Sequence, residues 1–213
     1  MEQSIGVFGK NLLLWTCLLR QIPQRPPAHV LHQQAGYLLD ELKASEESRQ
    51  LPVQSAEDGM FAIVALIDEV AMGLPDLRPI WSSAPLQATR FLTNNAGLEV
   101  FQRLGRVRQG PRSVLATFAV VLGLGFLGCY GLPGADRYAL DQLRRELGRE
   151  LGVDPDRDWS GGVLRRVHEG QVAALERFKA PWYRSVWIGR ALALLFALGA
   201  AAALFFALGG QWG

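Results

Sequence analysis

The sequence predicts an all-α protein in which a cytoplasmic helical domain precedes one C-terminal transmembrane helix. Apolar residues recur at helical spacing along most of the chain, and the alternation of period two that is typical of strands is not found. A run of 20 residues without a charge, ALALLFALGAAAALFFALGG, covers positions 191–210. With 49% hydrophobic residues and a mean hydropathy of +0.11, the chain is more apolar than most soluble domains. Its 213 residues suffice for one ordinary domain with an appendage, or for two small domains.

The first half of the chain contains three predicted helices. The apolar stretch 12–19 lies between Lys10 and Arg20 without the basic region or cleavage site of a signal peptide, so it is predicted to be an amphipathic helix. The next helix runs to about Ser48 along the stripe Leu31, Ala35, Leu38 and Leu42. For the third, Ser55 and Asp58 resemble a capping box. Its apolar stripe is Met60, Ile63, Ile67, Val70 and Leu74, and it ends at Gly73 and Pro75.

Further helices are predicted in the second half. Asp136 is placed to cap a helix in which Asp141 precedes Arg145 by four residues, with the stripe Leu140, Leu143, Leu147 and Leu151. Shorter helices are expected over 86–93, 98–107 and 163–178, and residues 154–162 are expected to form a loop.

The uncharged run 113–135 passes a simple hydropathy test for a membrane span, but its flanks argue against one. Four arginines lie on each side of it, so spanning would place four of them on the wrong side of the membrane. Its several glycines and Pro133 leave a helix of about 15 residues, which is short for a bilayer. We therefore expect this run to form a core helix of the cytoplasmic domain.

The run 191–210 has the length that a transmembrane helix needs. Basic residues precede it and none follows, which places the large N-terminal part in the cytoplasm. The expected layout is a cytoplasmic domain over 1–180, a basic and aromatic juxtamembrane segment over 181–190, the span, and a periplasmic tail over 211–213. The residues expected at the two membrane interfaces are Arg184, Trp187, Arg190 and Trp212.

Charge is balanced overall but unevenly distributed. The formal net charge is +2, which gives no basic field for nucleic acid, so no nucleic-acid partner is predicted. Residues 40–76 hold nine acids and two cations, a balance of −7, whereas residues 90–112 hold five arginines and one acid, a balance of +4. These segments form either solvated helix faces or surfaces that dock partners of both signs.

No catalytic, cofactor or metal site is predicted. The sequence GLGFLG at 123–128 matches a dinucleotide-binding fingerprint, but the glycines and proline that follow would interrupt the required helix, and no βαβ pattern surrounds it. We expect those glycines to end a helix or to permit close packing. His29 and His32 lack the further ligands of a metal site, and Cys17 and Cys129 are expected to be reduced core thiols.

The order of these segments resembles the TssL/DotU (IcmH) family, inner-membrane subunits of bacterial type VI secretion systems and of the related type IVB systems. The matching stretches are Ala65-Leu66-Ile67-Asp68-Glu69, then Trp81, then Gly97-Leu98-Glu99-Val100-Phe101, then Leu124-Gly125-Phe126-Leu127-Gly128-Cys129-Tyr130, and last the C-terminal anchor. Cys129 stands where the family usually has a basic residue, and Ala96 and Val100 replace a usual Gly and Phe. Many relatives also carry a peptidoglycan-binding domain after the span, which is not expected here.

The resemblance implies two small three-helix bundles that form a hook with a cleft, and a scaffolding role without catalysis. It implies an IcmF/TssM-like partner in the bacterial inner membrane, cytoplasmic baseplate partners and a homodimer, in addition to the lipid bilayer. The residues expected to bind partners are Asp68, Glu69, Trp81 and Glu99. Asp68 and Glu69 lie near the negative C-terminal end of their helix, where a carboxylate is unfavourable, which suggests a second requirement.

Two other classes of function remain open from the sequence. One is a tail-anchored adaptor unrelated to secretion, which would not co-purify with a large inner-membrane partner. The other is a membrane enzyme that uses the glycine run, which would bind a nucleotide.

Overall fold

The computed structural model describes residues 6–153, and within them every regular element is a helix, which confirms the all-α class. All described residues belong to one compact unit, Met1–Pro155. The predicted loop 154–162, the helix 163–178 and the membrane span 191–210 lie outside the described residues. The elements are α1 (Lys10–Gln21), α2 (Ala28–Ala44), α3 (Glu46–Arg49), α4 (Val53–Gly73), α5 (Arg78–Ser83), α6 (Leu86–Phe91), α7 (Ala96–Val107), α8 (Arg112–Gly123), the 3₁₀ turn η1 (Gly128–Gly131) and α9 (Arg137–Glu150).

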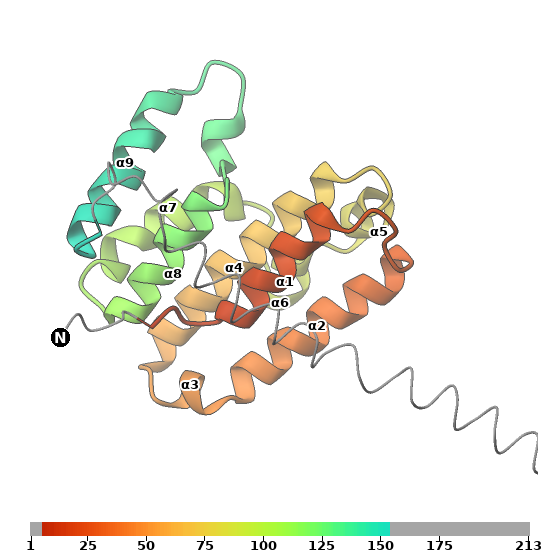
Figure 1. Cartoon of the computed structure of the whole chain (residues 1–213), viewed down its shortest axis with the longest axis horizontal. Coiled ribbons are helices and arrows are strands. Elements are labelled where there is room, and N and C mark those ends of the chain that lie inside the picture. Colours follow the sequence, from red (N-terminus) through yellow and green to blue (C-terminus); the bar gives the residue numbers. More distant parts are fainter. Residues whose placement is uncertain (1–5, 154–213) are drawn as a thin grey trace, which may run out of the picture. The chain divides into compact units, whose positions relative to one another are not determined.

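Helix α4 lies at the centre of this unit (Figure 1). Thirteen of its 21 residues are buried on all sides of the helix, as expected of a helix surrounded by others. It packs against the helices that precede and follow it in the first part of the described chain, namely α1, α2, α3, α5 and α6. It also packs against two later helices, α7 and α8. The helices thus share one continuous apolar core through α4 instead of forming two separate cores.

Helix α8 covers the other large share of this core. Phe118, Val121 and Leu122 are completely buried, and α8 packs mainly on α4. Among the described residues, Arg112–Gly131 is the one helical stretch long and apolar enough to cross a membrane by length and composition. The α-helix itself ends at Gly123 after 12 residues, too few for a bilayer. The prediction that this run forms a core helix is confirmed.

The N-terminal segment closes the core between α4 and α8. Phe8 is completely buried, and the hydroxyl of Thr117 in α8 donates to its carbonyl oxygen at 2.9 Å. A Cβ on Gly59 of α4 would lie 2.6 Å from the Phe8 ring, so the absence of a side chain there lets the ring pack. The helix predicted at 12–19 is therefore present as α1 and is a core element.

Most predicted helices are confirmed, with corrections at three local interactions. Ser55 and Asp58 do not form a capping box, because α4 begins two residues before Ser55, after Pro52. In α2 the buried stripe passes through Leu39 instead of Leu38. The Asp136 side chain caps α9 as predicted, accepting from the N–H of Ala139 at 3.2 Å. Within α9, however, Asp141 pairs with Arg144 at 2.8 Å and not with Arg145.

The glycine run 123–128 has the structural role expected of it. Gly123 is the last residue of α8, and Gly128 adopts a left-handed backbone with φ +51°. A Cβ on Gly128 would overlap the carbonyl oxygen of Gly97 at the start of α7. The run therefore ends one helix and allows two backbone segments to touch.

We expect Gly128→Ala to lower the free energy of unfolding by about 2 kcal/mol or more, because the methyl group meets backbone in a conformation that alanine disfavours. Urea unfolding of the detergent-solubilised protein, followed by circular dichroism, measures this loss. The matched control is Gly123→Ala in the same run, where no other atom lies within 4 Å of the added Cβ; its effect should stay within about 0.5 kcal/mol of zero or be stabilising. Equal losses in both variants would contradict the assigned contact.

Candidate functional site

The acidic pair near the end of α4 caps two other segments. The carboxylate of Asp68 accepts from the backbone N–H groups of Leu86 and Gln87, the first residues of α6, at 3.0 and 2.8 Å. The carboxylate of Glu69 accepts from the N–H groups of Leu127 and Gly128, where η1 begins, at 2.9 and 2.8 Å. Helix starts carry unpaired N–H groups that favour a negative charge. The unfavourable position on α4 is therefore offset by two favourable positions on its neighbours.

Asp68 is an interior residue with 3% of its surface exposed. Burial raises its pKa to about 6, against the opposing effect of the N–H groups of Gln87 and Leu86 and of the nearby His32 and Trp81. His32 Nε2 lies 2.8 Å from the carbonyl oxygen of Ala84 and its ring contacts Trp81 edge-on at 4.9 Å. Among the described residues, the Trp81 indole N–H is the one buried side-chain polar group without a well-formed hydrogen bond. These residues fix the turn between α5 and α6.

Three of the stretches that carry the family resemblance, residues 65–69, 97–101 and 124–130, meet at one junction. Glu69, from the first stretch, binds the backbone of the third. From the second stretch, Gly97 touches Gly128, and the Phe101 ring packs on Tyr130 at 4.9 Å and on Phe126 at 6.0 Å. The motifs thus specify a packing junction between α4, α7 and η1.

A groove of about 560 Å³ lies between α2, α3, α4 and α6. Its apolar lining is Leu39, Leu51, Val53, Ala56, Met60, Val64 and Phe91, and its charged side chains are Asp40, Lys43, Arg49, Glu57 and Arg90. Arg90 of α6 donates two hydrogen bonds to the Asp40 carboxylate and one to the carbonyl oxygen of Gly36. These bonds join α6 to α2. The same guanidinium lowers the pKa of Asp40. A groove with an apolar floor and charges of both signs suits a protein segment.

A second buried carboxylate holds α7 against α4 behind this groove. Asp58, 2% exposed, accepts from Arg103 at 3.1 Å and from Arg106 at 2.6 and 2.7 Å. The Arg103 guanidinium also lies 3.6 Å from the centre of the Phe61 ring, and Phe61 packs edge-on against Phe91 of the groove.

Glu99 closes the connection between α6 and α7. Its carboxylate accepts from the Thr93 hydroxyl in that connection and lies 3.6 Å from Arg103. Glu99 is partly exposed and is not among the residues that line the groove.

Leu92, at the end of α6, is strained and exposed. It is the one described residue other than glycine with positive φ, at 55°, and 93% of its surface is exposed. A leucine in the left-handed conformation costs roughly 1–2 kcal/mol of folding free energy. Because the Leu92 side chain is solvated in the isolated chain, no burial of apolar surface compensates for this cost. It lies next to Phe91 of the groove, so this loop presents an apolar side chain beside an apolar depression.

The residues predicted to bind partners are not gathered on one surface. Asp68 and Trp81 are buried, and Glu69 and Glu99 are partly exposed at two different segments. Asp68 and Trp81 have almost no exposed surface in the isolated unit, whereas Glu69 and Glu99 have some, and the binding of partners by these four residues stays a prediction. The predicted membrane-interface residues Arg184, Trp187, Arg190 and Trp212 lie outside the described residues.

Sequence reasoning missed Asp58, Arg90, Leu92 and the groove. The ion pairs join residues 45 to 50 positions apart, and local spacing carries no signal for them. The available signal for Leu92 was Asn94-Asn95 after it, a turn-prone pair that places it at a helix end.

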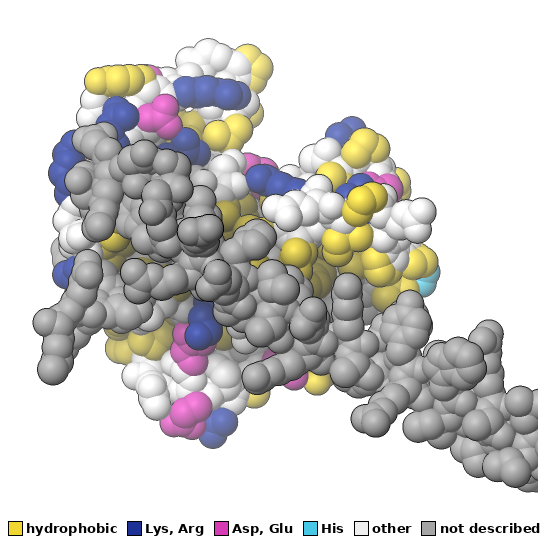
Figure 2. Space-filling view, in the orientation of Figure 1, with side chains coloured by type: hydrophobic (Ala, Val, Ile, Leu, Met, Phe, Trp, Pro, Cys, Tyr) yellow, Lys and Arg dark blue, Asp and Glu magenta, His cyan; other side chains and the backbone are white. Residues whose placement is uncertain are grey.

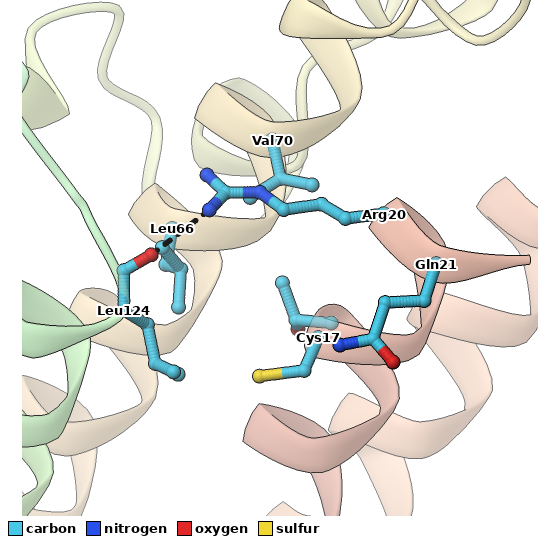
Figure 3. Close-up of a pocket in the computed structure, with 7 residues that line it drawn as sticks. Cys17, Arg20, Gln21, Leu66, Val70 and Leu124 are labelled. Atoms are coloured by element: carbon cyan, nitrogen blue, oxygen red, sulfur yellow. Dashed lines mark hydrogen bonds between the residues drawn. The ribbon is translucent and has the colours of Figure 1, made fainter.

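The described residues hold no group of three metal-binding side chains. A smaller cavity of about 180 Å³ lies beside Cys17 and Arg20 of α1, and Figure 3 shows both facing Leu124 at the end of α8, with Leu66 and Val70 of α4 behind. Arg20 donates to the Leu124 carbonyl oxygen at 2.9 Å. Burial raises the pKa of Cys17, which favours the protonated thiol at neutral pH. Cys17 is partly exposed, and so is Cys129, so neither is a fully buried core thiol as predicted.

We expect Asp68→Ala to lower the free energy of unfolding by about 3 kcal/mol, because two buried N–H groups lose their acceptor. Asp68→Asn keeps one oxygen, so its loss should be near 1 kcal/mol. Urea unfolding in detergent measures both. Asp141→Asn, at an exposed carboxylate, is the control and should change stability by no more than about 0.5 kcal/mol.

The same variants test the ionisation of Asp68. The folded protein binds this proton with a pKa of about 6 and the unfolded chain with 3.8, so the stabilisation by protonation is complete below about pH 4 and is lost as the pH rises through 6. The stability of the wild type relative to Asp68→Asn should fall over this range, by roughly 3 kcal/mol at most. A difference that stays constant with pH would contradict the burial of this carboxylate.

Comparison with known proteins gives a consistent result. The family model described as "Type VI secretion system protein DotU" matches residues 8–208. The cytoplasmic domain of TssL from Acinetobacter baumannii is 25% identical, with a TM-score of 0.58, over 68% of this chain and 92% of that one. SciP/TssL of the type VI system from enteroaggregative Escherichia coli 042 is 27% identical, with a TM-score of 0.53, over 70% and 86%. No curated protein matches the sequence. Since the family model covers both the helical unit and nearly all of the uncharged C-terminal run, this chain belongs to the DotU family of type VI secretion system proteins.

Proposed function

We propose that this chain is a scaffold subunit of the membrane complex of a type VI secretion system, tail-anchored in the inner membrane with its helical unit in the cytoplasm. The observation that carries the proposal is the family match over residues 8–208, which extends from the helical unit into the uncharged run 191–210. The basic residues before that run support the orientation. The role is mechanical and involves no chemical step.

The proposed docking surface for a cytoplasmic baseplate component is the groove between α2, α3, α4 and α6 together with Leu92. Apolar lining, rim charges of both signs and a strained, exposed leucine are features of an interaction site. Strain in the free protein is tolerated when a partner later buries the side chain. An IcmF/TssM-like protein in the membrane and a second copy of the chain are the other proposed partners.

The predicted partner-binding residues have two roles in this proposal. Asp68 and Trp81 are positioning residues that hold α6, which carries Phe91 and Arg90 of the groove. Glu69 and Glu99 are partly exposed and do not line the groove, and their contact with a partner stays a prediction. A tail-anchored adaptor outside secretion is the competing function, and it predicts no binding to baseplate components.

The proposed topology predicts that alkaline phosphatase fused after Gly213 is active, because this enzyme folds only outside the cytoplasm. The same reporter before Met1 should be inactive and serves as the control. Activity in bacterial cells, normalised to the amount of fusion protein, is the measurement. An inactive C-terminal fusion beside an active N-terminal one would reverse the orientation.

The docking surface predicts opposite effects of Leu92→Gly on folding and on binding. Glycine relieves the left-handed strain, so the free energy of unfolding should stay equal or rise by up to about 1 kcal/mol. Loss of an apolar anchor should weaken binding to the baseplate component of the same system about tenfold or more. Urea unfolding and titration of the detergent-solubilised chain with that component measure the two effects.

The matched control is Leu132→Gly, which removes another exposed leucine from a loop far along the chain. It should leave the affinity for the baseplate component unchanged. Binding that survives Leu92→Gly unaltered would exclude this loop from the interface, and no binding by the wild type would favour the adaptor function.

A further inference from the structure

The outer face of α9 carries arginines and a tyrosine. Leu140 and Leu147 are buried against the rest of the unit, and at about 100° per residue Tyr138, Arg145 and Arg149 lie on the opposite side of the helix. Figure 2 shows dark-blue side chains along this edge of the molecule, over the place of α9 in Figure 1. Among the residues that the structure describes, Tyr138, Arg145 and Arg149 line neither of the two cavities.

The acids of α9 are already engaged, so this face is positive. Glu146 and Glu150 bind Arg108 of the α7–α8 loop, both at 3.2 Å, and Asp141 binds Arg144. By contrast, Arg137, Arg145 and Arg149 form no ion pair with any residue in the range 6–153 that the structure describes.

A fourth guanidinium joins this group at the end of α9. Arg112, the first residue of α8, donates to the Glu150 carbonyl oxygen at 3.2 Å. The four arginines thus flank the helix from its first residue to its last.

Tyr138 adds an amphipathic ring to the arginines. It is 66% exposed, its hydroxyl accepts from Gln142 at 2.5 Å, and the Arg145 guanidinium lies 5.9 Å from the ring centre. Tyrosine and arginine together, with an apolar ring and a charged tip, are typical of surfaces at the level of lipid headgroups.

We propose that this face of α9, defined by Tyr138, Arg145 and Arg149 and flanked by Arg137 and Arg112, lies against the anionic headgroups of the cytoplasmic leaflet. The inference rests on the proposed cytoplasmic orientation. The chain supplies the membrane itself, because the last described residue, Val153, is joined through residues 154–190 to the predicted span at 191, and this tether keeps the unit at a high effective concentration near the lipid. Each cation near an anionic leaflet strengthens the association roughly fivefold, and salt weakens it. The membrane thereby fixes which way the unit faces its partners.

The full chain reconstituted in nanodiscs tests this proposal. A fluorescent NBD group on Gln142→Cys, in a Cys17→Ser/Cys129→Ser background, reports from the centre of the face. With phosphatidylglycerol discs carrying nitroxide headgroups we expect strong quenching, at least twofold above that in phosphatidylcholine discs with the same nitroxide content. The excess should disappear in 0.5 M NaCl, a test concentration well above the roughly 0.15 M physiological range.

Two charge-matched variants identify the cause. Arg137→Gln/Arg145→Gln/Arg149→Gln should abolish the excess quenching, whereas Lys10→Gln/Lys43→Gln/Arg49→Gln, which removes three cations from α1, α2 and α3, should retain it. Circular dichroism checks that both triple variants fold. Equal quenching in the two lipids would overturn the proposal and favour an acidic protein surface as the partner of this face. An equal loss of the excess quenching in both variants would also overturn it, because the net charge of the chain alone would then explain the effect. A chain that fails to enter discs of either composition would instead refute the anchoring in the proposed function.

Discussion

Three carboxylates on one buried helix bind three of the segments that pack around it. Asp58 binds two arginines of α7, Asp68 caps α6, and Glu69 caps η1. Because α4 is surrounded, each carboxylate can be satisfied only by the segment packed against it at that point. Burying a carboxylate is costly without such partners, so these bonds define which arrangement of the outer helices is acceptable.

Part of the uneven charge along the sequence is paired within the described unit. The acidic stretch 40–76 and the basic stretch 90–112 pair with one another, through Asp40 with Arg90 and through Asp58 with Arg103 and Arg106. Two of the nine acids and three of the five arginines are thereby paired with one another. Among the described residues, Arg137, Arg145 and Arg149 of α9 form no ion pair. The helix α9 lies outside both of the charged stretches, 40–76 and 90–112.

Most helices and the core role of α8 could be predicted, because periodicity, helix-ending glycines and flanking charges are local signals. The site was predicted only in part. Asp68, Glu69, Trp81 and Glu99 are predicted to bind partners, and this role stays a prediction. In the structure Asp68 caps α6, Glu69 caps η1, and Trp81 is buried beside His32. The groove could not be predicted, since its lining comes from four helices and depends on how α6 is seated against α2.

The sequence by itself determined the helical class, the uncharged run 191–210 and the family. These depend on the spacing of apolar residues, on the length of the run and on the order of short motifs. Only the tertiary structure decided what the motif residues do. The hydrogen-bond donors for Asp68 and Glu69 lie 18 and 58 residues further along the chain, and Gly97 meets Gly128 across 31 positions. A carboxylate is read as a docking residue, a solvated charge or a cap according to which N–H groups the fold brings to it, and one-dimensional spacing does not contain that information.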